Sequence, residues 1–174
     1  MSDAFDITPP AIQTPRLRLR ALTRDDAPAV HTYAFDPETV RFLPWRPNSS
    51  EMFAHGIIKL ITQPDYLNWA ITLPPADRAI GMIFLHAFSR QHRKAELAFN
   101  LARAHWRRGL ATEAVTAVLH FGFHRLSLNR IEALCMPENL ASRKLLGKSG
   151  LTFEGTMRKV HHRYDGFQDM DLFA

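Results

Sequence analysis

The stretch Trp106-Arg107-Arg108-Gly109-Leu110-Ala111-Thr112 constrains the fold most, because it joins a predicted strand to a predicted helix. Alternating apolar residues predict the strand over 94–101, and helical apolar spacing predicts the helix over about 110–125. The first turn of a helix carries backbone amides without partners and a partial positive charge. Gly109 admits a ligand close to the backbone, and two arginines add full charge. We therefore interpret residues 107–112 as a site for a phosphate-bearing ligand, and call it the phosphate cradle.

The chain has 174 residues, a length that suits one domain with one core. Apolar residues make up 46% and charged residues 22%, as in ordinary soluble globular proteins. The sequence shows no apolar stretch near the ~20 residues that span a bilayer and no signal-peptide pattern at its start. Cys135 is the only cysteine, which excludes an intramolecular disulfide and a cysteine-based metal site. These features favour a reducing cytoplasm.

The net charge of +5 favours an anionic partner without choosing among nucleotide cofactors, nucleic acid and membrane surfaces.

Hydrophobic patterning predicts the element order β-α-α-β-β-β-α-β-α-β-β, which is typical of an α/β domain with a mixed sheet. We expect a single domain over residues 1–174, with residues 1–13 as a loose lead-in. The predicted strands cover about 16–20, 66–73, 80–88, 94–101, 130–136, 152–158 and 168–173. The predicted helices cover about 23–33, 50–62, 110–125 and 139–149, the last closed by Gly150.

Two well-known phosphate motifs are absent from the chain. It has no G-x-G-x-x-G fingerprint, which argues against a Rossmann dinucleotide site. Gly147-Lys148-Ser149 imitates the end of a P-loop, but Ser142 stands where the first glycine is required. His120 and His124 have a spacing that suits a metal, but Phe121 follows His120 where a zinc protease has glutamate. We interpret these histidines as a solvated helix face and expect no metal site.

The cradle is followed, at tight spacing, by a strand, by Pro137-Glu138-Asn139-Leu140-Ala141-Ser142 and by Gly150-Leu151-Thr152-Phe153-Glu154-Gly155. In this order the chain resembles the GNAT acyl-CoA-dependent N-acetyltransferases, within the branch that contains the ribosomal-protein N-terminal-alanine acetyltransferases. The resemblance covers about 14–173 and includes Thr14 to Leu19 and Leu43-Pro44-Trp45. It implies an α/β, GNAT-like three-layer domain. The central sheet would be mixed, mostly antiparallel, with about seven strands flanked by about four helices.

The resemblance also implies a cosubstrate, acetyl-CoA, and the residues that bind it. The cradle would hold the pyrophosphate through backbone amides, and the preceding strand would present backbone groups to the thioester carbonyl and the pantetheine. A side-chain amide would bond the pantetheine arm, and a serine would lie near the thiol. The implied residues are Phe99, Leu101, Arg107, Arg108, Gly109, Leu110, Ala111, Thr112, Asn139 and Ser142. Trp106 departs from the family's usual glutamine or arginine, a change that backbone contacts to phosphate would tolerate.

Acetyl transfer needs a neutral amine, and the cost of deprotonation depends on the amine. An α-amine with a pKa of about 8 costs roughly 1.4 kcal/mol at pH 7, and a lysine with a pKa of about 10.4 costs roughly 4.6 kcal/mol. An N-terminal substrate therefore needs little help, and a water-linked carboxylate would suffice. Glu96 is the first candidate base, because it lies on the strand expected to hold the thioester, on the side away from Leu97 and Phe99. The alternative is a structural carboxylate paired with a neighbouring arginine.

The second candidate base is His162 or its neighbour His161, since histidine titrates in the useful range. Adjacent strand residues point to opposite faces, so at most one of them would face the acceptor. Another branch of the family uses a tyrosine seven residues after the motif asparagine, but that position is Leu146 here. Ser142 or Tyr164 would then stabilise or protonate the thiolate. A thiol with a pKa of about 8.5 also leaves without a protein acid.

Some residues admit a structural and a functional interpretation. For Trp45, the functional interpretation is a wall of the acceptor cleft and the structural one is packing between helices. We interpret Cys135 as a small buried hydrophobic residue in an apolar strand. Asp169 attracts the amine or pairs structurally with Arg158 or Arg163.

Three functions remain open from the sequence. The first is an acetyl-CoA-dependent N-acetyltransferase that moves the acetyl group directly, in a ternary complex, to a primary amine of a protein N-terminus or a small molecule. The second is a non-catalytic acyl-CoA sensor on the same fold. The third is a nucleic-acid-binding module, which the absence of basic residues interleaved with stacking aromatics disfavours. A basic chain attracts basic ribosomal proteins poorly unless its cleft is acidic. We expect a monomer or homodimer that does not bind membranes.

Overall fold

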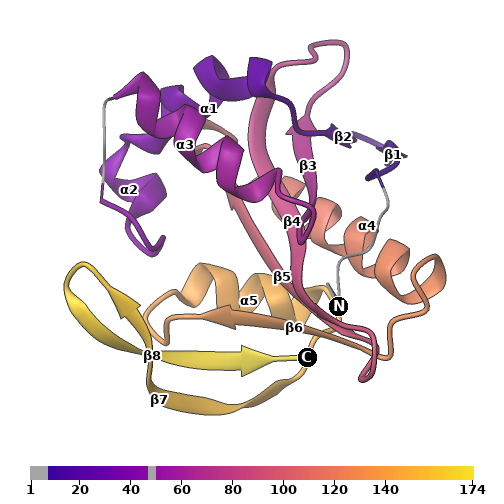
Figure 1. The fold of residues 1–174 in the computed structure, drawn as a ribbon, viewed down its shortest axis with the longest axis vertical. Helices are drawn as coiled ribbons and strands as arrows, with labels where there is room; N and C mark the ends of the chain where they lie inside the picture. Colours follow the sequence, from indigo (N-terminus) through magenta and orange to yellow (C-terminus); the bar gives the residue numbers. More distant parts are fainter. Residues whose placement is uncertain (1–7, 47–49) are drawn as a thin grey trace.

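The computed structural model describes residues 8–46 and 50–174, which form a sheet flanked by helices (Figure 1). The strands are β1 (Ile12–Gln13), β2 (Arg18–Ala21), β3 (Leu67–Thr72), β4 (Ala79–Ser89), β5 (Lys94–Leu101), β6 (Arg130–Cys135), β7 (Phe153–Arg163) and β8 (Gly166–Phe173). The α-helices are α1 (Ala27–Ala34), α2 (Pro37–Val40), α3 (Glu51–Ile61), α4 (Leu110–His124) and α5 (Leu140–Lys148), with 3-10 turns at Arg24–Asp26 and Arg103–His105.

The sheet has eight strands in the order β1-β2-β3-β4-β5-β6-β8-β7. All neighbours pair antiparallel except β5 and β6, which are parallel, so the predicted mixed and mostly antiparallel sheet is confirmed. The strand beyond the expected seven is β1, which pairs Ile12 with Leu19 inside the segment predicted as a loose lead-in. A strand of 2 residues is too short to show alternation, so periodicity does not reveal it.

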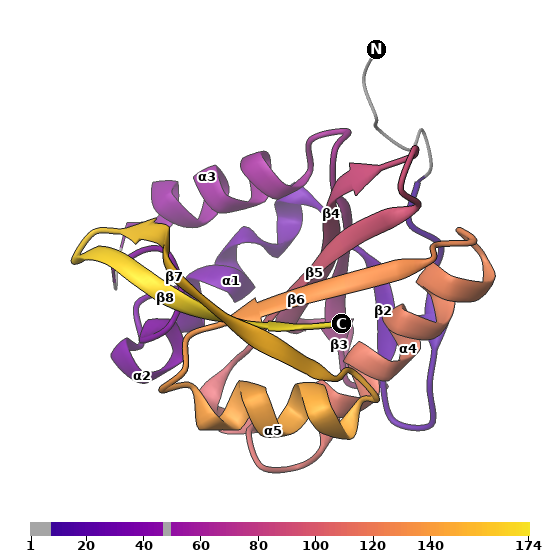
Figure 2. The ribbon, with the colours of Figure 1, turned by 90° about the horizontal axis from the view of Figure 1, so that it is seen from below.

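Helices cover both faces of the sheet, which gives the predicted three layers (Figure 2). On one face α4 packs its apolar side onto the sheet, where Trp69 meets Phe121 edge-on at 5.5 Å between ring centroids. On the other face, side chains of α1 and α3 form a second core with Ala70 and Met82. Among the described residues, no helix has the length and apolarity that a membrane crossing requires.

The sheet opens in its middle, between its two parallel strands. β5 pairs with β6 only where Lys94–Glu96 faces Arg130–Glu132. Beyond this point β5 continues beside β4 to Leu101, whereas β6 turns to β8 and pairs its residues 133–135 with 171–173. Residues 97–101 of β5 therefore have no strand partner on the β6 side, and backbone groups that point there remain available to a ligand.

Candidate functional site

The phosphate cradle lies at the start of α4, as the sequence predicts. Gly109 precedes the helix with φ = 74°, and Arg107 also has a left-handed backbone, with φ = 58°. The first amide that donates within the helix is that of Glu113, to the Gly109 carbonyl at 3.1 Å. Within the described part of the chain, the amides of residues 107–112 donate to no backbone acceptor. This run of free donors, at the positive end of a helix dipole and beside two exposed arginines, is suited to an anion.

The strand before the cradle turns its backbone toward the open side of the sheet. The Ala102 amide donates to the Ile80 carbonyl at 2.8 Å, so Ala102 bonds toward β4. In an antiparallel pair, alternate residues bond to the partner strand. Leu101 and Phe99 therefore direct their amides and carbonyls away from β4, into the opening. The indole of Trp106 donates to the Leu101 carbonyl at 2.7 Å, which leaves the Leu101 amide as the free group there.

Asn139 and Ser142 lie at the start of α5, as predicted. The Asn139 side-chain oxygen accepts from the Ser142 amide at 3.1 Å and so caps the helix. The two N–H donors of the Asn139 side chain remain available to a ligand. The predicted closure of this helix is confirmed, because Gly150 follows it with φ = 97°.

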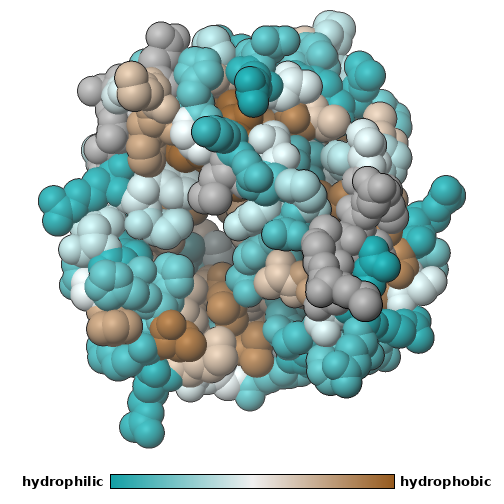
Figure 3. All heavy atoms as spheres, in the orientation of Figure 1, coloured by the Kyte–Doolittle hydropathy of each residue, from teal (hydrophilic) through white to brown (hydrophobic). Residues whose placement is uncertain are grey.

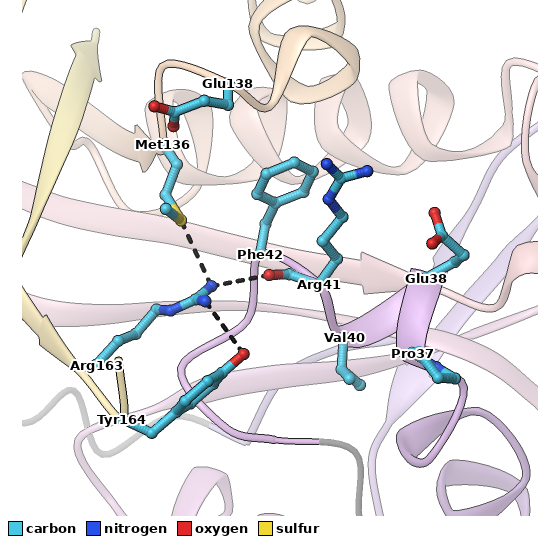
Figure 4. Close-up of a pocket in the computed structure, with 9 residues that line it drawn as sticks. All are labelled: Pro37, Glu38, Val40, Arg41, Phe42, Met136, Glu138, Arg163 and Tyr164. Atoms are coloured by element: carbon cyan, nitrogen blue, oxygen red, sulfur yellow. Dashed lines mark hydrogen bonds between the residues drawn. The ribbon is translucent and has the colours of Figure 1, made fainter. Parts of the chain in front are cut away.

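A pocket of about 480 Å³ lies between α2 and the far ends of β6 and β7. Its wall is lined by Pro37, Glu38, Val40, Arg41, Phe42, Met136, Glu138, Arg163 and Tyr164 (Figure 4). The surface is hollowed in this part of the molecule, between the helices α2 and α3 and the β7–β8 hairpin (Figure 3). Three segments far apart in the chain thus form one cavity.

The guanidinium of Arg163 joins these segments. Its side chain is only 6% exposed. It donates to the Arg41 carbonyl at 2.8 Å and to the Tyr164 hydroxyl at 3.1 Å (Figure 4). It also donates to both carboxylate oxygens of Asp165. The hydrogen bonds to Asp165 raise the pKa of Arg163 and lower that of Asp165. Arg163 therefore ties the chain after α2 to the β7–β8 hairpin.

Two carboxylates lie at the mouth of the pocket. Glu38 and Glu138 are exposed and come from different walls (Figure 4). Neither makes an ion pair within residues 8–46 and 50–174. Asp165 offsets the charge of Arg163, which leaves two carboxylates and the guanidinium of Arg41 among the lining residues. The guanidinium of Arg46, 4.7 Å from the centroid of the Tyr164 ring, adds a second positive charge beside them.

Glu96 lies on the face of the sheet covered by α1 and α3, opposite the α4 side where Leu97 packs. The alternative interpretation pairs Glu96 with an arginine, whereas in the structure its carboxylate lies 3.4 Å from the Nε2 atom of His86. The His86 ring stacks on Tyr66, with 5.4 Å between centroids. Glu96 is the last β5 residue paired with β6, so it stands where the sheet begins to open.

The other candidates for proton transfer are scattered. His162 is exposed and packs edge-on against Phe167 at 4.9 Å, and His161 is partly buried on the same strand. The ring of Tyr164 lies between two guanidinium groups, those of Arg46 and Arg163, each 4.7 Å from its centroid. Of the four predicted catalytic residues, only Tyr164 lines the pocket, while Glu96, Ser142 and His162 lie outside its lining.

The remaining ambiguous residues take structural positions. Trp45 packs edge-on against Phe53 at 6.0 Å. Asp169 accepts from the Lys159 amide at 3.0 Å and pairs with its ammonium group, so its structural partner is Lys159 rather than Arg158 or Arg163. Cys135 is buried as predicted, and burial, with the nearby carboxylate of Asp171, raises the pKa of its thiol to about 11.

The His120 and His124 rings lie side by side, 4.2 Å apart. Among the described residues, no group of three or more histidine, cysteine, aspartate and glutamate side chains is arranged to hold a metal ion.

Sequence reasoning missed Arg163, Glu38 and Glu138 as pocket residues. The missed signal is Asp165-Gly166, a dipeptide typical of tight hairpin turns. β7 and β8 run up to this turn, whereas the predicted strands stop at about 158 and resume at 168. The extension carries Arg163 and Tyr164 into the pocket wall.

Comparisons with known proteins agree with this geometry. Residues 16–152 match the family described as the acetyltransferase (GNAT) domain. The uncharacterized N-acetyltransferase YoaA of Bacillus subtilis is 31% identical over 169 residues, which cover 95% of this chain and 96% of the relative. The ribosomal-protein-serine acetyltransferase of Escherichia coli is 24% identical over 98 residues, covering 56% of this chain and 55% of the relative.

Among solved structures, a GNAT-family acetyltransferase from Bacillus anthracis superposes with a TM-score of 0.84 and 26% identity. The match covers 94% of this chain and 96% of that one. The chain belongs to the GNAT acetyltransferase family, and its predicted resemblance is confirmed.

Proposed function

We propose that this GNAT N-acetyltransferase moves the acetyl group of acetyl-CoA directly to a primary amine, with both substrates bound at once. The observation that carries the proposal is the run of free amides at residues 107–112, beside a strand whose backbone faces an opening in the sheet. A diphosphate on the amides and a thioester along the strand match these two features.

In this proposal, acetyl-CoA lies from the cradle into the opening of the sheet. The cradle amides and the side chains of Arg107 and Arg108 hold the diphosphate. The free amides of Phe99 and Leu101 face the pantetheine and the thioester carbonyl, where a donor stabilises the oxygen that gains charge during attack. The Asn139 amide nitrogen bonds a carbonyl of the pantetheine arm, and Ser142 lies near the sulfur.

The acceptor enters through the pocket between α2 and the β7–β8 hairpin. Glu38 and Glu138 draw in a cationic amine, which loses a proton before it reacts. Acceptors with this chemistry are protein N-termini and small primary amines. These two carboxylates would be the contacts for a basic acceptor on a chain that is basic as a whole.

The reaction forms a C–N bond and breaks a C–S bond. The amine nitrogen attacks the thioester carbon, and the tetrahedral intermediate expels the thiolate of CoA. Glu96 is the proposed base, taking the amine proton through water, with His162 as the second candidate. Tyr164 or Ser142 returns a proton to the sulfur, or water does so. Binding both substrates supplies the proximity that this step needs.

The test measures thiol release from acetyl-CoA with a panel of N-terminal peptides, amino acids, polyamines and aminoglycosides. Glu96→Gln is expected to lower kcat about 100-fold and leave the KM for acetyl-CoA unchanged. The matched control is Glu132→Gln, because Glu132 faces Glu96 in the register but is held by Lys94 and Arg130. Tight acetyl-CoA binding without thiol release for any amine would make the protein a sensor.

A further inference from the structure

A segment from the N-terminal end of the chain reaches across to the phosphate cradle. The carboxylate of Glu113, in the first turn of α4, accepts a hydrogen bond from the Thr14 hydroxyl at 2.6 Å. It also accepts from the Arg16 amide at 2.9 Å and from the Arg16 Nε atom at 2.6 Å. These residues lie 97 to 99 positions from Glu113 in the chain. We call this set of contacts the Arg16–Glu113 clamp.

The same guanidinium also contacts the cradle itself. Arg16 Nη1 donates to the Arg108 carbonyl at 2.8 Å. The carbonyl and the following amide of a trans peptide point in opposite directions. Holding the Arg108 carbonyl on Arg16 therefore turns the Gly109 amide away from Arg16. A β-carbon on Gly109 would lie 3.3 Å from Arg16 Nη2, so the guanidinium packs closely against this turn.

The clamp also neutralises a negative charge beside the cradle, that of the Glu113 carboxylate. A carboxylate in the first turn of a helix occupies the place where an anion would bind, and it repels a diphosphate. In this chain the Glu113 carboxylate is neutralised by Arg16 and shared among donors from Thr14 and Arg16. Removing Arg16 would free a negative charge beside the cradle and release the Arg108 carbonyl at the same time.

We infer that Arg16 is a positioning residue for donor binding, acting on the cradle through the Arg108 carbonyl and the Glu113 carboxylate. The inference rests on the proposed role of the cradle in holding the diphosphate of acetyl-CoA. In this inference the N-terminal segment orients the Arg108 peptide and neutralises the Glu113 carboxylate, which the cradle residues do not do by themselves.

The test compares two acetyl donors, acetyl-CoA and S-acetylpantetheine, which lacks the diphosphate and nucleotide. Arg16→Met is expected to raise the KM for acetyl-CoA about tenfold, with kcat within about twofold, and to leave the KM for S-acetylpantetheine unchanged. The milder Arg16→Lys keeps the charge but loses the planar fork, so a rise of about threefold is expected. Arg18→Met is the matched control: Arg18 is 50% exposed like Arg16, and its nearest carboxylate is Asp77, at 3.7 Å.

A double variant separates positioning from general destabilisation. In Arg16→Met/Glu113→Gln the unpaired carboxylate is gone, so the KM for acetyl-CoA is expected to fall back about threefold from that of Arg16→Met. Equal losses with both donors, or no recovery in the double variant, would overturn the role of Arg16. A wild-type enzyme that does not prefer acetyl-CoA over S-acetylpantetheine would instead overturn the cradle's role in donor binding.

Discussion

The two halves of the proposed site are built in different ways. The donor half uses one continuous stretch, residues 107–112, and its binding groups are backbone amides. The acceptor half is assembled from residues 37–42, 136–138 and 163–164, and its binding groups are side chains. Backbone amides are present whatever the side chains are, so the donor half depends on conformation. The acceptor half depends on residue identity, and single exchanges can change its specificity.

Exchange of Gly109 for alanine is expected to have the largest effect on substrate binding, because it changes the backbone conformation of the cradle. The residue has φ = 74°, which side chains with a β-carbon adopt at a cost of about 1–2 kcal/mol. Relaxing this turn moves the cradle amides, and the KM for acetyl-CoA is expected to rise about tenfold or more. Steady-state kinetics with varied acetyl-CoA at saturating amine measures the change.

Gly147→Ala is the matched control for this exchange. Gly147 lies inside α5, and a β-carbon there would meet nothing within 4 Å. Alanine at this position is expected to leave the KM for acetyl-CoA unchanged and to stabilise the helix slightly. Similar donor constants for Gly109→Ala and Gly147→Ala would contradict a cradle that depends on backbone shape.

Arg163→Met tests the acceptor half at its most connected side chain. The exchange removes the bonds to the Arg41 carbonyl and to Asp165, so the chain after α2 loses its tie to the β7–β8 hairpin. We expect the KM for the amine to rise about fivefold while the KM for acetyl-CoA stays unchanged, with a Tm a few degrees lower. Arg158→Met, at an exposed position of the same strand, is the control. Equal changes in both substrate constants would contradict the separation of the two halves.

The donor half comes from one continuous stretch and the acceptor half from distant segments, and this difference explains what could be predicted from the sequence. Gly109, the flanking arginines and the apolar spacing after Leu110 are neighbours in the chain, so local rules locate the start of α4 and the cradle. The alternating pattern just before it predicts the strand that carries Phe99 and Leu101, whose binding role the family resemblance implies. The donor half was predictable because each signal is local.

The acceptor half was not predictable, because its contacts are between distant segments. Arg163 meets the Arg41 carbonyl across 122 positions of sequence, and local patterns carry no information about this contact. The partner of Glu96 was missed for the same reason, since His86 becomes its neighbour only through the register of β4 with β5. Even in the donor half one contact was not predictable. The hydrogen bond from the Trp106 indole to the Leu101 carbonyl forms only when the turn between them is folded.

Glu38→Gln and Glu138→Gln are expected to have smaller effects, because both carboxylates are exposed. Each exchange should raise the KM for a cationic amine about threefold at low salt, and the difference should vanish at about 0.5 M salt, where screening is strong. Glu154→Gln is the control, since Glu154 lies outside the pocket lining and pairs with Arg130. A salt-independent effect would contradict an electrostatic role for these carboxylates.

The smallest expected effect is on folding in acid, and it again distinguishes the halves. Burial opposes ionisation of Glu113, but hydrogen bonds from Thr14 and Arg16 outweigh it and hold the pKa of Glu113 below its usual value. An unfolded glutamate has a pKa of about 4.3. The clamp therefore stabilises the fold above this pH, and the contribution is lost as the pH falls through the lower pKa of the folded state.

Urea unfolding of the wild type and Glu113→Gln measures this contribution. The free energies of unfolding are expected to differ by about 1 kcal/mol at pH 7, the usual net contribution of one hydrogen bond, and to converge as the pH falls below the pKa of Glu113 in the folded state. In the acceptor half, Glu138 makes no ion pair within the described residues, so Glu138→Gln is expected to match the wild type at both pH values. A constant difference for Glu113→Gln across this range would show that the exchange disturbs packing. A difference that converges for Glu113→Gln alone would locate the acid-sensitive contact in the clamp behind the cradle.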